Sequence, residues 1–81
     1  MRHARADYDR IQDPAGLIPD DEPVFLVRGS DAVAVRTVRF WANEAEAKGA
    51  ASNIVEAARR QADEMEEWSR RVGCKVPDMP A

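Results

Sequence analysis

The chain is built around residues 53–73, NIVEAARRQADEMEEWSRRVG. At about 100° of rotation per residue, the charged side chains gather on one side of this stretch. The opposite side carries Ile54, Val55, Ala58, Ala62, Met65, Trp68, Ser69 and Val72. This pattern predicts an amphipathic helix with one buried face. Ser52 or Asn53 is the expected cap, the pair Asn53 and Glu56 has capping-box spacing, and Gly73 is expected to end the helix.

A first helix is predicted directly before it. Ser30 and Asp31 are strong N-cap residues, and the helix is expected to start there, to run to Lys48 and to stop at Gly49. The short connection between the helices predicts an antiparallel hairpin. In this hairpin, alanines allow a close approach of the backbones, and the large core side chains are expected to be Trp41, Met65 and Trp68.

The first helix has two apolar sides. The main face is predicted to consist of Ala34, Val35, Val38, Trp41, Ala42 and Ala45. Val33, Phe40 and Ala47 recur at seven-residue spacing on nearly the opposite side. One helix cannot cover both sides, so the second stripe must be buried either by the N-terminal part of the chain or by another subunit. Together with Phe25, Val33 and Phe40 are the predicted interface residues.

The N-terminal part is predicted to be extended. Residues 1–23 form an arm and a proline-rich loop, which is ordered if Leu17 and Ile18 are buried. Val24–Val27 is a short apolar run typical of a strand, and three partners are open to it: a symmetry mate, the arm, or the helices. Residues 24–81 are expected to form a single domain, so the predicted fold class is mainly α, completed by oligomerisation.

Composition narrows the choice of function. The 81 residues carry 12 basic and 15 acidic side chains, a net charge of −3 that disfavours general DNA or RNA binding. The chain has one cysteine and no apolar leader or anchor, so a reducing cytoplasm and no membrane are expected. A domain of this size has a thin core, and self-association is a natural way to bury more apolar surface.

The sequence shows no catalytic constellation. His3 stands near the terminus and Cys74 follows a helix C-terminus, and neither has a visible base or orienting partner. Opposite charges at four-residue spacing along residues 56–71 are typical of a solvated helix surface. An acidic metal site at Asp63, Glu64, Glu66 and Glu67 is the weaker interpretation, because arginines alternate with it. We therefore expect no enzyme, no cofactor and no metal.

One cluster suggests a ligand. Arg28, Gly29, Ser30 and Asp31 precede a predicted helix start, and Arg36 and Arg39 follow it. Free N–H groups at a helix start and forked guanidinium groups can bind a phosphate, so Arg28, Ser30, Arg36 and Arg39 are predicted to hold one. Asp31 completes this five-residue anion site: its carboxylate counts against an anion at the N–H groups but could accept a hydrogen bond from a ribose hydroxyl or a base edge. Tyr8 and Arg10 are predicted to act as its lid. The plainer interpretation is a capped helix with solvated arginines.

The chain also resembles small uncharacterised proteins carried by phages and prophages. The resemblance lies in Tyr8–Pro14 (YDRIQDP), Ile18 and Pro19, Glu22–Arg28 (EPVFLVR), Asp31, and Lys75–Pro80 (KVPDMP). It covers most of the chain but carries no assigned chemistry. It implies a viral protein in the cytoplasm of a bacterial host, where such proteins often counter host defence by blocking a defence protein or sequestering a nucleotide signal.

These observations yield a leading hypothesis and two alternatives. The leading one is a non-enzymatic homo-oligomeric binding protein that sequesters a phosphate-bearing small molecule, such as a cyclic nucleotide. The alternatives are an anti-CRISPR-like inhibitor of a host defence protein and a virion assembly protein.

Overall fold

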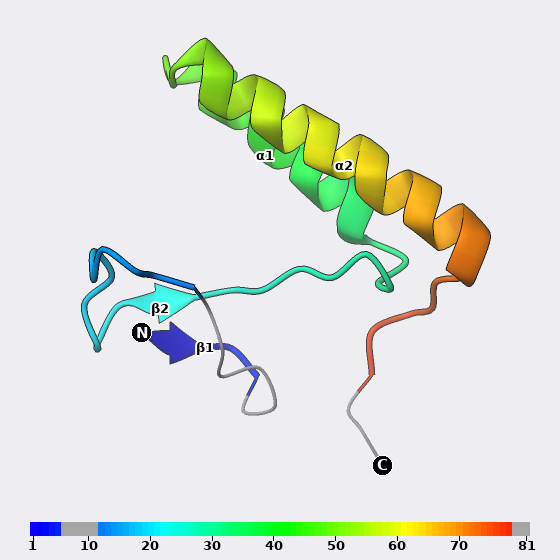
Figure 1. The fold of residues 1–81 in the computed structure, drawn as a ribbon, viewed down its shortest axis with the longest axis horizontal. Helices are drawn as coiled ribbons and strands as arrows, with labels where there is room; N and C mark the ends of the chain where they lie inside the picture. The colour runs from blue at the N-terminus through cyan, green and yellow to red at the C-terminus, as the bar shows by residue number, and fades with distance from the viewer. Residues whose placement is uncertain (6–11, 79–81) are drawn as a thin grey trace.

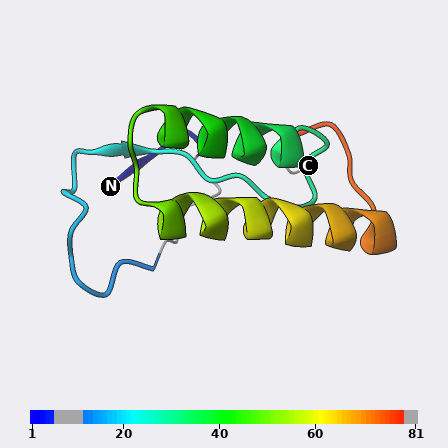
Figure 2. The same cartoon turned by 90° about the horizontal axis from the view of Figure 1, so that it is seen from above.

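A computed structural model describes residues 1–5 and 12–78. In these ranges the chain forms two short strands, β1 (Arg2–His3) and β2 (Pro23–Val24), and two helices, α1 (Ala34–Ala47) and α2 (Ser52–Val72). The helices pack side by side, and residues 48–51 connect them (Figures 1 and 2). The prediction of a mainly helical chain is confirmed.

The predicted start of α1 is wrong. The helix begins at Ala34, with Val33 as the N-cap residue and no side-chain cap. Ser30 and Asp31 lie instead in a turn, where the Asp31 N–H donates to the Arg28 carbonyl at 3.0 Å. The Asp31 carboxylate accepts the Arg28 backbone N–H at 3.3 Å. The carboxylate therefore closes the turn and does not cap the helix.

A second contact holds this turn in place. The Ala32 N–H donates to the Lys75 carbonyl at 2.7 Å, and the Lys75 N–H donates to the Ser30 carbonyl at 2.9 Å. Together they form a parallel bridge between Asp31 and Lys75. Because a bridge requires locally extended backbone, the C-terminal segment delays the start of α1.

The predicted caps of α2 are also wrong, whereas the two glycine stops are confirmed. Ala51 is the N-cap residue of α2, and no side chain caps it. Its carbonyl accepts the N–H groups of Ile54 and Val55. Gly49 and Gly73 follow α1 and α2 with φ of 87° and 118°, a left-handed conformation that ends a helix and suits glycine.

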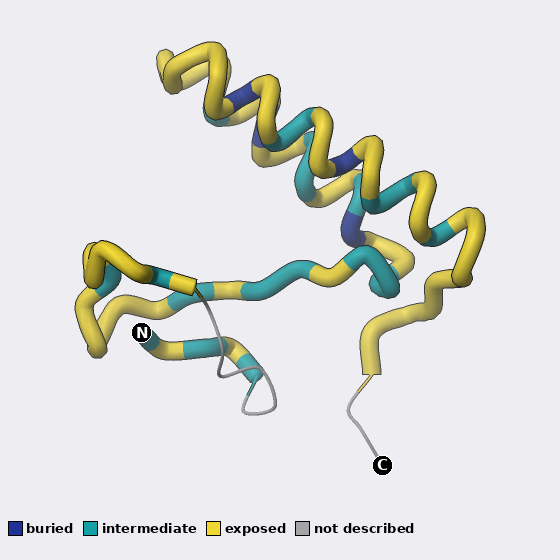
Figure 3. The backbone as a smooth tube through the Cα atoms, viewed as in Figure 1, coloured by how far each residue is buried: buried dark blue, intermediate teal, exposed yellow. Residues whose placement is uncertain are grey.

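The core between the helices is small. Among the described residues, the fully buried hydrophobic ones are Ala34, Ala42, Val55 and Ala62 (Figure 3). The prediction that both tryptophans belong to the core is wrong, because Trp41 is 53% exposed and Trp68 38% exposed. Small side chains let the helix backbones approach closely, and this leaves no room for an indole between them.

The two flanks of the helix pair differ in chemistry. On one flank, Arg39 bridges to Asp63 at 3.0 Å and to Glu66 at 3.2 Å. On the same flank, Arg59 bridges to Glu46 at 3.2 Å and donates to the Asn43 side chain at 3.0 Å. Helical spacing places Trp41 of α1 on the opposite flank, together with Ile54, Met65 and Trp68 of α2. We call these four residues the apolar flank.

The N-terminal arm pairs with the strand-like segment. β1 and β2 are parallel, with Arg2 opposite Pro23 and His3 opposite Val24. Of the three partners considered for residues 24–27, the arm is therefore the one that pairs, through Val24. The backbone of neither strand comes close to α1 or α2, and Figure 1 shows the sheet standing apart from the helices.

The loop before β2 is ordered by hydrogen bonds. The Asp13 carboxylate accepts the N–H groups of Leu17 at 3.1 Å and Ile18 at 3.0 Å, and the N-terminal ammonium group donates to the Pro19 carbonyl at 2.6 Å. Leu17 nevertheless remains 79% exposed, and Ile18 is half-buried. The alternative in which Leu17 and Ile18 are both buried is therefore wrong, and the Asp13 carboxylate supplies the partners of the loop backbone.

The segment after β1 contacts the segment after α2. The Arg5 guanidinium donates to the Asp78 carbonyl at 2.8 Å. Lys75 forms an ion pair with the Asp78 carboxylate at 2.9 Å, and this contact lowers the pKa of that carboxyl. In the described ranges, neither helix has a segment apolar and long enough to cross a membrane.

Candidate functional site

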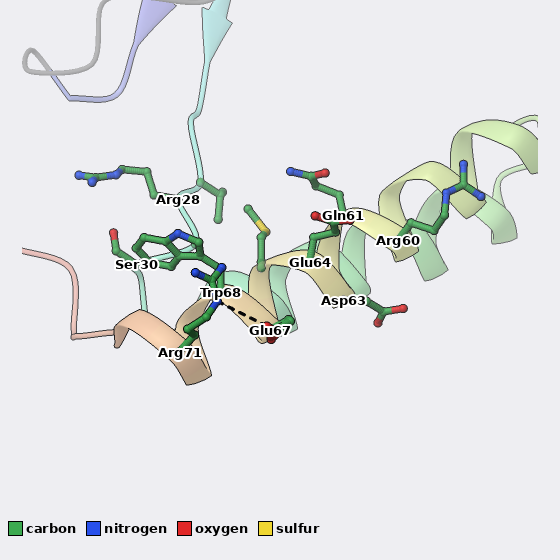
Figure 4. A pocket seen from close by; sticks show the side chains of 12 residues that line it. Arg28, Ser30, Arg60, Gln61, Asp63, Glu64, Glu67, Trp68 and Arg71 are labelled. Atoms are coloured by element: carbon green, nitrogen blue, oxygen red, sulfur yellow. Dashed lines mark ion pairs between the residues drawn. The ribbon is translucent and has the colours of Figure 1, made fainter.

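A hollow of about 910 Å³ opens between residues 27–30 and α2. We call residues 24–30 the strap, because they lead from β2 to the turn before α1. Figure 4 shows the side chains around the hollow, with Arg28 and Ser30 on the strap and the other labelled residues on α2. The hollow is lined by Val27, Arg28, Gly29, Ser30, Arg60, Gln61, Asp63, Glu64, Met65, Glu67, Trp68 and Arg71.

The strap touches α2 at one end of the hollow. A Cβ atom on Gly29 would lie 3.6 Å from the Trp68 ring and 3.8 Å from the Met65 side chain, which is ordinary van der Waals contact. Val27, Met65 and Trp68 therefore give the hollow an apolar floor. From this point the strap leads away from the helices towards β2 (Figure 1).

The rim of the hollow carries balanced charge. Arg28, Arg60 and Arg71 stand among Asp63, Glu64 and Glu67. Arg71 forms an ion pair with Glu67 at 3.5 Å, and Asp63 forms one with Arg39. A rim with equal numbers of both signs gives little net field, so it does not concentrate anions strongly.

The structure does not bring the five residues of the predicted anion site together. Arg28 and Ser30 line the hollow, whereas Asp31, Arg36 and Arg39 do not. Arg36 is exposed on α1. The Arg39 guanidinium is held by Asp63 and Glu66, and these hydrogen bonds raise its pKa. The predicted lid residues Tyr8 and Arg10 lie outside the described residues.

Sequence reasoning missed the α2 side of the hollow. Arg60, Glu64, Glu67 and Arg71 were interpreted as a solvated helix surface. No local signal marked the strap contact, because Met65 and Trp68, which Gly29 approaches, were assigned to the core between the helices. That the strap reaches α2 depends on the bridge between Asp31 and Lys75, which has no sequence signature.

The three predicted interface residues are all uncovered by their own chain. Val33 is 54% exposed, Phe40 66% and Phe25 72%. Val33 and Phe40 lie on the side of α1 that helical spacing turns away from α2, and we call them the outer stripe. Phe25 lies on the strap, next to β2.

Within residues 1–5 and 12–78, no three His, Cys, Asp or Glu side chains are grouped so that they could hold a metal ion. The sole cysteine, Cys74, is exposed. The chain matches no family model, no curated protein and no solved structure. Its function is therefore inferred from its own surface.

Proposed function

We propose that this chain is a non-enzymatic binding protein that works as a homo-oligomer. The observation that supports the proposal is its surface area. The chain exposes 6427 Å², whereas a folded monomer of 9.0 kDa exposes about 4,850 Å². The excess is about 1,600 Å² per copy. An obligate homodimer interface buries an area of this size on each of its two copies.

The dimensions of the chain support the same proposal. Its radius of gyration is 14.0 Å, against about 12 Å for a compact domain of this length. Several of the exposed side chains are large and apolar, including Phe25, Phe40 and Trp41. A single small domain rarely leaves so many of these in water.

Native mass spectrometry of freshly purified protein tests the proposal. We expect a multiple of the 9.0 kDa chain mass that falls on dilution. Replacing Phe40 by Ser should reduce the number of copies, because it removes an aromatic ring from the outer stripe. The matched control is Thr37→Ser, an exposed position on the same side of α1. A single-copy mass at all concentrations contradicts the proposal.

A phosphate-bearing small molecule, such as a cyclic nucleotide, is a second candidate ligand. The observation that favours it is the Trp68 indole, which borders the hollow beside Arg28 and Arg71 (Figure 4). An indole offers a stacking surface for a planar base, and a guanidinium offers a fork for a phosphate. The proposed site is thus moved from the start of α1 to the hollow.

Titration calorimetry with a panel of cyclic and linear nucleotides tests this ligand. We expect binding to the wild type, loss of binding in Trp68→Ala, and unchanged binding in Trp41→Ala, whose side chain does not line the hollow. Absence of heat at micromolar protein rules out the nucleotide and leaves self-association standing.

The resemblance to phage proteins suggests a setting for either function, inside a bacterial host as an anti-defence protein. A protein–protein inhibitor of a host defence complex would use the outer stripe, and a virion protein would remain with particles. Pull-down from host lysate distinguishes them, because a protein that sequesters a nucleotide recovers no stoichiometric protein partner. Co-purification with virus particles would favour the assembly role.

A further inference from the structure

The apolar flank of the helix pair is covered at one end and open at the other. Near the start of α1, the strap closes on Met65 and Trp68 at Gly29. Towards the loop that joins the helices, Trp41 remains 53% exposed and Ile54 50% exposed. The strap has left the helices in this region and leads to β2 (Figure 1).

The chain before the helices also carries unburied apolar side chains. Phe25 on the strap is 72% exposed, and Leu17 in the loop before β2 is 79% exposed. The two-stranded sheet formed by β1 and β2 makes no close backbone contact with either helix. A two-stranded sheet is marginal in water without a surface to pack on, so Phe25 and the apolar flank both remain available for a further surface.

We infer that a second copy of this chain packs here, with Phe25 and the β1–β2 sheet of each copy on the apolar flank of the other. This inference rests on the proposed self-association and adds a contact surface to the outer stripe. A two-fold axis makes such an exchange reciprocal, so Phe25 of one copy meets Trp41 and Ile54 of the other. Each copy then buries the two surfaces that it leaves exposed alone.

The excess of exposed surface favours a second copy over a small ligand as the partner. The excess of about 1,600 Å² per chain is larger than a small molecule in the hollow can cover, and it matches one side of a large homodimer interface. The balanced charge around the hollow also suits a second copy of an equally mixed chain better than a strongly charged partner.

Cross-linking between two engineered cysteines tests the inference. In a Cys74→Ser background, one chain carries Phe25→Cys and another carries Ile54→Cys; both positions are exposed, so both chains are expected to fold. The two are mixed, allowed to exchange subunits and treated with a short bis-maleimide. We expect a covalent heterodimer, and no such product when Glu56→Cys, on a different side of α2, replaces Ile54→Cys.

A single chain that carries both cysteines completes the experiment. We expect links between chains, seen as dimers and longer products on a denaturing gel. If the double variant instead closes within one chain, or if neither arrangement links, the inference is overturned while the native mass still reports self-association. If the native mass is that of a single copy, the proposed self-association fails as well.

Discussion

Single residues set the charge of the helix contact. Arg59 of α2 binds Glu46 of α1, and its hydrogen bonds lower the pKa of the Glu46 carboxyl. In the sequence, opposite charges at four-residue spacing predicted ion pairs within α2. The structure has such pairs between Glu66 and Arg70 and between Glu67 and Arg71, but it pairs Arg59 across the helix contact instead.

The Glu46 contact predicts a pH dependence of stability. A carboxyl with a lowered pKa in the folded state adds stability above its unfolded pKa, about 4.3, and loses it as the pH falls through the folded pKa. We expect Arg59→Gln to lower the thermal midpoint at pH 7 slightly, and the difference from wild type to shrink as the pH falls below the unfolded pKa and through the lowered folded pKa. Arg36→Gln, an exposed change of the same charge, is the control. A difference that is constant with pH would contradict this account.

The two helices show how element boundaries arise. Their C-terminal ends were predicted from glycine, and Gly49 and Gly73 do end them with positive φ. Their N-terminal ends were mispredicted, because a capping side chain has competing partners: the Asp31 carboxylate bonds to the Arg28 N–H. A glycine with positive φ ends a helix through its backbone and has no side chain that could bind elsewhere. It is therefore a more reliable signal of a helix end than a capping residue is of a helix start.

The positive φ of Gly49, in the connection between the helices, can be tested by substitution. Gly49 has φ of 87°, and a Cβ atom there would meet nothing within 4 Å, so any cost of Gly49→Ala comes from the backbone. We expect a loss of about 1–2 kcal/mol in the free energy of unfolding. Gly29→Ala is the matched control, because its Cβ makes only ordinary contacts. Chemical denaturation followed by circular dichroism measures both; equal losses in the two variants would refute the conformational explanation.

At the scale of the whole molecule, stability is expected to depend on protein concentration. The core of one copy consists of three alanines and one valine among the described residues, and association adds the buried area that such a core lacks. The thermal midpoint should therefore rise when the protein is concentrated a hundredfold. Calorimetry across that range measures it, and a midpoint independent of concentration would indicate that the single chain is self-sufficient.

The sequence by itself determined the helices, their glycine stops and the excess of apolar side chains, because helical spacing and left-handed backbone are local properties. Only the tertiary structure decided where those side chains went. Because alanines bring the two helices close together, Trp41 and Trp68 remain at the surface. The bridge between Asp31 and Lys75 holds the strap next to α2. Such contacts join residues far apart in the chain, so no local pattern records them.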